Sequence, residues 1–366
     1  MKTSLVLASL STLSLTTAAP AAEPQHHGHG GGRPSKLKYP GLDVLAKQAG
    51  LLYFGTAIDN VVLNNTQYIS IAHNASEFGQ VTPANGQKFM YIEPQRNVFN
   101  YTMADQIIKP AIAAGQIRRC HNFVWHNQLP DWLTSRNWTK TELVSILENH
   151  IKHEAQYFNT DGPGGCYAWD VVNEAFNEDG TLRSDIWLNT IGPEYIELAF
   201  KFARKYTSPH TRLYYNDYNI ETVNNKSQAV AALIKDFNKR DIPIDGVGLQ
   251  AHFTVGRSPS YDQVKAAISL FNELGVEAAI TELDVRTAIP DNSTQQAQQA
   301  KIYADTVKAC VDSDDCVGVT VWDFWDPVSW VPDTFPGYGD ADLLSANFTR
   351  KPAYYAVSDV LRDDGE

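Results

Sequence analysis

Eight short apolar segments alternate with segments of helical periodicity along this chain, and this alternation constrains its fold more than any other feature. Like buried strands, the apolar segments are rich in β-branched and aromatic residues; they cover residues 51–58, 77–82, 117–126, 166–172, 211–217, 244–252, 276–285 and 316–324. The intervening segments 139–158, 227–240 and 261–275 repeat apolar residues at helical spacing. This order predicts an α/β fold, a single (β/α)8 TIM barrel. A doubly wound open sheet is the alternative, but no Gly-rich phosphate loop follows the first predicted strand.

The N-terminal region has the pattern of a secretory leader. Residues 1–19 combine Lys2, an apolar run and a small-residue region, which predicts a signal peptide. A membrane anchor is the alternative, but the apolar run is short and broken by Ser and Thr. Residues 20–38 are rich in Pro, Gly and His, and we interpret them as a flexible leader rather than a metal-binding tract. Residues 39–366 then form the barrel domain, and the protein is expected to be secreted and extracellular.

Composition and charge narrow the range of partners. The 30 Lys and Arg residues are outnumbered by 42 Asp and Glu residues, giving a formal net charge of -12. This balance argues against a nucleic-acid partner, which needs a basic footprint, and no later segment has the length and apolarity of a membrane span. We expect a monomer. Sequons for N-glycosylation, which suit a secreted protein, occur at Asn64, Asn74, Asn100, Asn137, Asn225, Asn292 and Asn347.

The four cysteines fit an oxidising compartment. Cys310 and Cys316 lie close together in "CVDSDDC", and we expect a disulfide between them. Cys120 and Cys166 lie in predicted strands of one sheet and are candidates for a second disulfide. No C-x-x-C spacing of the metal-ligand kind occurs, so no metal site is predicted.

Polar, ionisable and aromatic residues recur where the predicted strands end. In a parallel barrel these ends form one rim, which is where active sites lie. A single residue of this kind is explained by strand capping or a rim salt bridge, whereas the whole set favours an active site. The set comprises His126, Asn173, Glu174, Asn216, Asp217, Gln250, His252, Glu282, Asp284 and Trp322.

Two carboxylates on different strands suggest hydrolysis of a glycosidic bond. One carboxyl group would protonate the leaving oxygen, and at about 5–5.5 Å the second attacks directly, which retains the configuration. Such a pair also separates in pKa, so one group stays protonated while the other is ionised. We assign these roles to Glu174 and Glu282. No cofactor is required.

Neighbouring residues could support this pair. Asn173 could bond a sugar hydroxyl, and His252 could orient the nucleophile while Asp284 fixes its imidazole. Aromatic residues suit the apolar faces of sugar rings, although Trp132 fits rim packing equally well; they are Trp125, Trp132, Trp322 and Trp330.

Residues 42–360 resemble glycoside hydrolase family ten, whose best-known members are secreted endo-1,4-β-xylanases. The motifs are "HNFVWHNQLP", "WDVVNEA", "YYNDYN", "GLQAHF", "ITELD" and "VWDFWDPVSW", in family order. The resemblance implies a catalytic barrel and a retaining mechanism, with Glu174 as acid/base and Glu282 as nucleophile. It implies an aromatic clamp of Trp322 and Trp330 over the sugar whose bond is cut. Around that sugar it implies Asn173, His126, Gln250, His252, Asn216 and Tyr218.

One stretch departs from the family pattern. Where members read close to "TPENxMKW", this chain reads "TPANGQKF", which keeps Asn85 and Lys88 but has Ala84 in place of the acidic residue and Phe89 in place of Trp. Cys120 likewise stands where Gly is usual. In the family, the Glu, Asn and Lys of this stretch bond the sugar of the −2 subsite. Loss of the charged acceptor at residue 84 would cost about 1.5–3 kcal/mol of sugar binding, and we expect Phe89 to alter the wall of the −2 subsite.

Three functions follow from these features. The first is an endo-1,4-β-xylanase that acts on plant cell-wall xylan. The second is a tomatinase-like hydrolase that releases the tetrasaccharide from the saponin α-tomatine through an altered sugar subsite. The third is a non-catalytic carbohydrate-binding protein on the same fold, which the presence of both Glu174 and Glu282 disfavours. In every case the expected partner is a polysaccharide or an oligosaccharide glycoside.

Overall fold

The computed structural model of the protein describes residues 40–158 and 165–362. The predicted signal peptide, residues 1–19, and the predicted leader, residues 20–38, lie outside the described residues. The signal peptide and the flexible leader therefore stay predictions.

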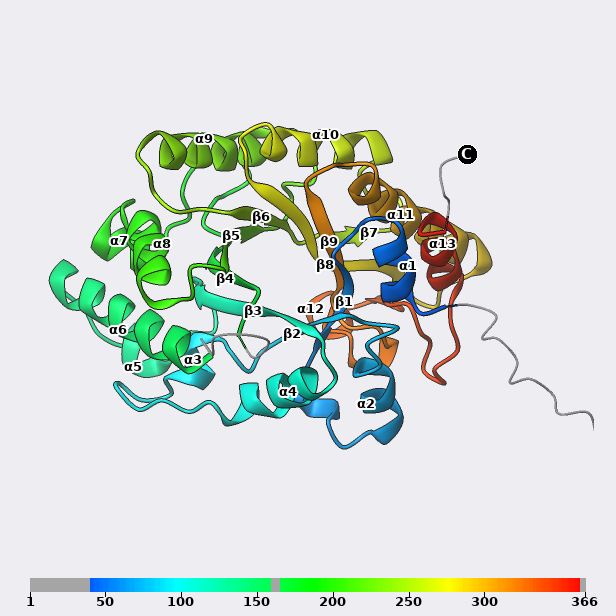
Figure 1. Ribbon diagram of the computed structural model, residues 1–366, viewed down its shortest axis with the longest axis horizontal. Helices are drawn as coiled ribbons and strands as arrows, with labels where there is room; N and C mark the ends of the chain where they lie inside the picture. Colours follow the sequence, from blue (N-terminus) through cyan, green and yellow to red (C-terminus); the bar gives the residue numbers. More distant parts are fainter. Residues whose placement is uncertain (1–39, 159–164, 363–366) are drawn as a thin grey trace, which may run out of the picture. The chain divides into compact units, whose positions relative to one another are not determined.

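Eight parallel strands form a closed barrel, as the sequence predicts (Figure 1). Each strand pairs in parallel with its neighbours, and the last of the eight pairs with the first, which closes the sheet. The barrel strands are β1 (Tyr53–Ile58), β2 (Gln80–Pro83), β3 (Ile117–Val124), β4 (Ala168–Asn173), β5 (Arg212–Asp217), β6 (Gly246–Leu249), β8 (Glu277–Ala288) and β9 (Cys316–Val321).

Helices surround the barrel strands (Figure 1), and short turns and strands lie in the connecting loops. The helices are α1 (Leu42–Gln48), α2 (Thr66–Ala72), α3 (Phe89–Ile92), α4 (Thr102–Ala113), α5 (Asp131–Thr134), α6 (Lys140–Phe158), α7 (Ile186–Ile191), α8 (Tyr195–Tyr206), α9 (Asn225–Lys239), α10 (Tyr261–Asn272), α11 (Ser293–Val311), α12 (Val331–Thr334) and α13 (Pro352–Val360). Two 3-10 turns, η1 (Asn60–Val62) and η2 (Asp326–Val328), and two short strands, β7 (His252–Thr254) and β10 (Tyr338–Gly339), complete the described elements. None of the described helices combines the length and apolarity needed to cross a membrane.

Burial explains why the strand and helix patterns were readable in the sequence. Every residue of β1 and β4 is buried, because the barrel interior covers one face and helices cover the other. On α6 the predicted apolar stripe, Leu143, Ile146, Leu147 and Ile151, is buried.

Two predicted strands differ from those observed. The predicted strand 244–252 breaks after Leu249, since Ala251 adopts a left-handed backbone conformation with φ 63 and the chain resumes as β7. The strand β8 continues to Ala288, beyond its predicted end, because β7 and β10 pair with this extension.

Both predicted disulfides are present. Cys310 pairs with Cys316, and Cys120 pairs with Cys166 across the neighbouring strands β3 and β4. The Asn side chains of all seven sequons are exposed, so the fold leaves room for a glycan at each of them. Their glycosylation stays a prediction.

A buried ion pair joins the neighbouring strands β3 and β4. The guanidinium of Arg119 on β3 lies 2.8 Å from the carboxylate of Asp170 on β4, and both side chains are almost fully buried. The same carboxylate contacts His121 Nδ1 at 3.0 Å, and the ring of Tyr214 lies 4.2 Å from the guanidinium. Removal of one partner would leave a buried charge without compensation.

We therefore predict that Asp170→Ala lowers the free energy of unfolding by about 3–5 kcal/mol, because Arg119 would stay buried and charged. Chemical denaturation of the variant measures the loss. The matched control is Asp305→Ala, which removes the exposed pair with Lys301 and should cost about 1 kcal/mol or less. Equal losses in the two variants would contradict the interpretation.

Candidate active site

One cavity of about 690 Å³ opens at the rim, and residues from all eight barrel strands or the loops that follow them line it. Most of the predicted site residues line this cavity. They are Asn85, Lys88, Trp125, Asn173, Glu174, Tyr218, Gln250, His252, Glu282, Trp322 and Trp330.

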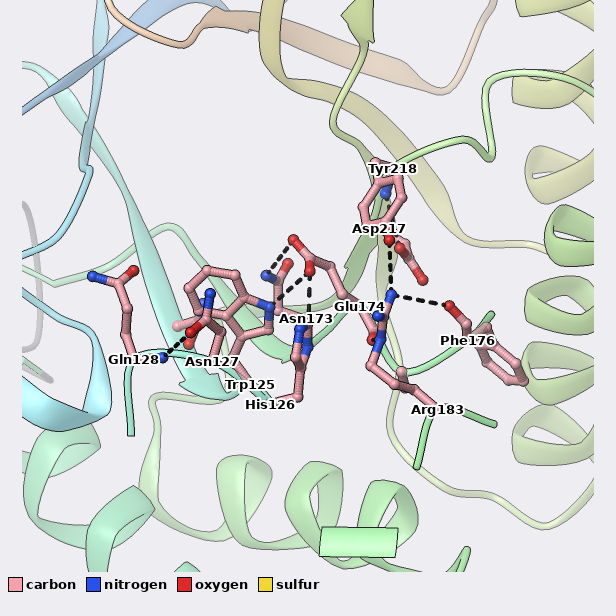
Figure 2. A network of polar contacts seen from close by, with 12 residues as sticks. Trp125, His126, Asn127, Gln128, Asn173, Glu174, Phe176, Arg183, Asp217 and Tyr218 are labelled. Atoms are coloured by element: carbon pink, nitrogen blue, oxygen red, sulfur yellow. Dashed lines mark hydrogen bonds and ion pairs between the residues drawn. The ribbon is translucent and has the colours of Figure 1, made fainter. Parts of the chain in front are cut away.

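Glu174 enters the cavity through a turn at the end of β4. The strand ends at Asn173, and Glu174 itself has φ 57, a left-handed conformation that costs a non-glycine residue about 1–2 kcal/mol. Its carboxylate accepts a hydrogen bond from Trp125 Nε1 at 2.8 Å, and His126 Nδ1 lies 3.8 Å away (Figure 2). Gln250 Nε2 donates a further hydrogen bond to it at 3.1 Å. The strained turn therefore carries the carboxylate out of the core and into a set of donors.

Glu282 lies deeper, on β8, and is only 5% exposed. One carboxylate oxygen accepts a hydrogen bond from Asn216 Nδ2 at 2.8 Å, and the other lies 3.2 Å from His252 Nε2. The other nitrogen of this imidazole, Nδ1, lies 2.8 Å from Asp284 Oδ2, which also accepts a hydrogen bond from Trp330 Nε1 at 2.7 Å. Asp284 thus holds the imidazole against Glu282.

The electrostatics of this chain of groups favour an ionised Glu282. Burial alone would raise the pKa of Glu282, but the hydrogen bond and charge of His252, together with His121, outweigh burial and lower that pKa below its usual value. For His252, burial opposes the charged form, whereas Asp284 and then Glu282 favour it and raise its pKa to about 10. At neutral pH the site therefore holds the Glu282 carboxylate beside the His252 imidazolium.

Three amides connect the two carboxylates. The Oδ1 atom of Asn173 accepts hydrogen bonds from Asn216 Nδ2 at 2.9 Å and from Gln250 Nε2 at 3.2 Å. Each of these donors also bonds one of the carboxylates, Asn216 to Glu282 and Gln250 to Glu174. The two acidic groups therefore lie in one cavity with different donors: Glu282 has an imidazole neighbour on a buried strand, and Glu174 lies closer to the mouth.

Four of the residues singled out at predicted strand ends do not line the cavity: His126, Asn216, Asp217 and Asp284. Asn216 is fully buried, and its amide is used internally, since its Oδ1 atom also accepts the hydroxyl of Thr281 at 2.7 Å. His126 Nδ1 lies 3.8 Å from the Glu174 carboxylate, and Asn216 donates to Glu282, so each lies against a carboxylate. Their contacts with a sugar stay a prediction. Trp132 also lies outside the cavity lining, and its ring packs against Phe89 and Trp138.

Several lining residues were missed by the sequence analysis. Asp59 directly follows β1, Asp323 lies two residues beyond the end of β9, and Arg286 directly follows the predicted strand 276–285, so the strand-end rule could have found all three. His121 lies in the middle of β3, where no strand end was predicted. Gln128 follows β3 in a loop, and its side-chain amide donates to Asn85 Oδ1 at 3.0 Å.

The stretch that departs from the family pattern forms one end of the cavity. Ala84, Asn85 and Lys88 line it, but Phe89 does not: its side chain is 2% exposed and its ring stacks on the buried imidazole of His150 at 3.5 Å. The expectation that Phe89 reshapes the sugar subsite was therefore wrong.

An acidic group is nevertheless present at this end of the cavity. Asp59 Oδ2 lies 2.6 Å from Asn85 Nδ2, and Asn85 Oδ1 accepts the ammonium of Lys88 at 3.0 Å. Burial lowers the pKa of Lys88 to about 8, although the charges of Glu282, Glu174 and Asp59 oppose this shift. Asp59 thus supplies an acidic neighbour where residue 84 has none.

The described residues offer no group of three or more His, Cys, Asp or Glu side chains arranged to hold a metal ion. The groups that the cavity offers for chemistry are the two carboxylates, the His252 imidazole and the amides around them. They suit a reaction that needs one proton donor and one anionic group at the same reacting centre.

Comparisons with known proteins agree with this geometry. The sequence profile of glycosyl hydrolase family 10 matches residues 41–360. The chain is 46% identical over 316 residues to endo-1,4-beta-xylanase D of Talaromyces funiculosus, covering 86% of this chain and 76% of that protein. It is 45% identical over 329 residues to endo-1,4-beta-xylanase A of Humicola insolens, with coverages of 88% and 86%. A crystal structure of a family member from Bispora sp. MEY-1 with xylobiose superposes with a TM-score of 0.84 at 41% identity, covering 87% of this chain and 99% of that one.

The His252 contact with Glu282 leads to a prediction about protonation. Replacement by Gln in His252→Gln removes the imidazolium, so burial should dominate and the pKa of Glu282 should rise above its value in the unsubstituted protein. NMR titration of isotope-labelled glutamate carboxyl groups measures the shift. The control is His210→Gln at an exposed position, which should leave the Glu282 titration unchanged. An unchanged pKa in His252→Gln would contradict the assignment.

Proposed function

The chain belongs to glycosyl hydrolase family 10, and we propose that it is a secreted, retaining endo-1,4-β-xylanase that cleaves plant cell-wall xylan. The observation that carries the proposal is the pair Glu174 and Glu282, which line one cavity and are joined through the Asn173, Asn216 and Gln250 amides. Relatives at 40–46% identity bear the name endo-1,4-beta-xylanase, which supports the substrate class.

In the first step the Glu174 carboxylic acid donates its proton to the glycosidic oxygen as the bond to the anomeric carbon breaks. The Glu282 carboxylate attacks that carbon from the opposite face and forms a glycosyl-enzyme ester. The low pKa of Glu282 keeps the attacking group ionised. Its hydrogen bonds to Asn216 and His252 hold the carboxylate in place before the reaction.

In the second step Glu174, now a carboxylate, takes a proton from a water molecule whose oxygen attacks the anomeric carbon. The bond between that carbon and Glu282 breaks, and two inversions leave the configuration unchanged. Trp125 Nε1 and Gln250 Nε2 donate hydrogen bonds to the Glu174 carboxylate and hold it in position for this step. Trp322 and Trp330 supply aromatic surface beside the reacting sugar.

The choice of xylan over α-tomatine rests on the cavity end near Ala84. Phe89 is buried and does not line the cavity, and Asp59, Asn85 and Lys88 form a connected polar set there. The main structural motive for a tomatinase is thus weakened. Incubation of the protein with xylan and, separately, with α-tomatine tests the choice: reducing sugar from xylan alone supports the proposal, and release of the tetrasaccharide without xylan cleavage would overturn it.

Secretion is supported by two independent features. The predicted signal peptide would direct export, and the two disulfides are typical of proteins that mature in an oxidising compartment. We further propose that the protein acts as a monomer.

Substitution of Glu174 and substitution of Glu282 should have different kinetic effects. With an aryl β-xylobioside that has a good leaving group, Glu282→Ala should abolish turnover because no ester can form. Glu174→Ala should still form the glycosyl-enzyme but hydrolyse it about 10²–10⁴-fold more slowly, since the general base is missing. Rapid-mixing kinetics of phenol release measure both steps. Unimpaired hydrolysis of the intermediate in Glu174→Ala would contradict the assignment.

Asp59 should contribute to substrate binding rather than to bond cleavage. In Asp59→Ala the Asn85 amide loses its charged acceptor, so we predict about a tenfold rise in KM for xylo-oligosaccharides, with a much smaller change in kcat. Steady-state kinetics measure both constants. The exposed Asp262 in Asp262→Ala provides a charge-matched control, and a KM equal to that of the control would count against the role of Asp59.

A further inference from the structure

Arg286 differs from the other cationic residues of the cavity. Lys88 bonds Asn85, His121 contacts Asp170, and His252 lies between Glu282 and Asp284. Among the residues that the structure describes, the Arg286 guanidinium has no hydrogen bond and no ion pair, although its side chain lines the cavity and is half-buried. A guanidinium carries five N–H donors, so this cavity wall presents unused charge and unused donors.

The backbone and one aromatic ring hold Arg286 in position. Thr254 of β7 pairs with Arg286 in the sheet, and Val255 N donates to its carbonyl at 3.0 Å. On the side-chain end, the Phe335 ring lies 3.9 Å from the guanidinium carbon. A guanidinium stacked on a ring keeps its edge free for a planar, bidentate partner such as a carboxylate.

The position of Arg286 along β8 indicates which part of a substrate it can reach. Glu282, Asp284 and Arg286 alternate along one face of the strand, and each two residues advance about 6.6 Å. Arg286 therefore lies about 13 Å further along β8 than the nucleophile. Phe335 also contacts Trp330 edge to face at 5.5 Å. A group that meets Arg286 must therefore project from a sugar near Trp330 rather than belong to the bond that is cut.

Acidic groups elsewhere in the cavity would repel an anion, since Asp59, Glu174, Glu282 and Asp323 line it. Lys88 is a second long cationic side chain there, but Asn85 engages its ammonium and Asp59 lies against Asn85. The surrounding charges therefore favour an anion at Arg286. Asp284 stands two residues before Arg286 and is fully buried, and its Oδ2 atom is bonded by His252 and Trp330. Its Oδ1 atom has no hydrogen-bond partner among the described residues, so Asp284 does not take up the donors of Arg286.

We propose that Arg286 binds a carboxylate carried as a side group on the sugar chain, as in a uronic acid substituent, so that the enzyme favours acidic over neutral xylan. This inference rests on the proposed xylanase function. The binding residue adds no step to the reaction; it contributes a charge-assisted hydrogen bond to substrate recognition.

The test compares one polymer in two chemical forms. Glucuronoxylan and the same glucuronoxylan with its carboxyl groups reduced to alcohols are given to the wild-type protein, to Arg286→Ala and to Arg257→Ala. Arg257 is exposed, lies outside the cavity lining and matches the change in net charge. The readout is the ratio of kcat/KM for the acidic polymer to that for the reduced polymer, so any general effect of a substitution cancels.

We expect a ratio of about ten for the wild type and for Arg257→Ala, and about one for Arg286→Ala. Added salt should lower the wild-type ratio, since the contact is partly exposed and screened. A wild-type ratio near one, or a ratio that survives in Arg286→Ala, would overturn the inference while cleavage of the reduced polymer still supports the xylanase function. Cleavage of neither polymer by the wild type would overturn both.

Discussion

The contact between His252 and Glu282 is the interaction on which the proposed chemistry depends. A carboxylate that is only 5% exposed would ordinarily be neutral, because burial disfavours its charge. Here the imidazole lies 3.2 Å from one carboxylate oxygen, and Asp284 keeps that imidazole charged from the other side. The order Glu282, His252, Asp284 alternates negative, positive and negative charge, which lets the buried nucleophile stay ionised. All three residues lie on β7 and β8, two paired strands.

The barrel makes this arrangement possible by bringing distant parts of the chain to one rim. Glu174 and Glu282 are more than one hundred residues apart in sequence, yet both belong to strand ends that open into the same cavity. The left-handed conformations of Glu174, Ala251 and Asp323 occur where β4, β6 and β9 give way to the cavity wall. Strain of this kind persists only when surrounding structure enforces it, and the closed sheet, with the buried Arg119–Asp170 pair beneath the site, provides that support.

The fold and the two carboxylates could be predicted from sequence because each leaves a local signal. Buried strands are apolar and β-branched, and Glu174 and Glu282 stand where such runs end. The depth of a side chain leaves no comparable signal. Asn216 lies near the end of a strand, as other site residues do, but Thr281 and Glu282 from β8 engage its amide, which only the folded barrel shows. Phe89 adjoins Lys88 in sequence, yet its ring stacks on the buried imidazole of His150 from α6 and does not line the cavity. Arg286 was missed although it directly follows the predicted strand 276–285, and the pairing of β7 and β10 with the extension of β8 that contains it was not expected.

The central claim is that Glu282 forms a covalent bond to the sugar. The most direct measurement treats the protein with a fluorinated xylobioside whose glycosyl-enzyme hydrolyses slowly, digests the inactivated protein and locates the added sugar by mass spectrometry. The account predicts one sugar unit per chain, attached at Glu282. Attachment at another residue, or inactivation without a covalent adduct, would contradict it.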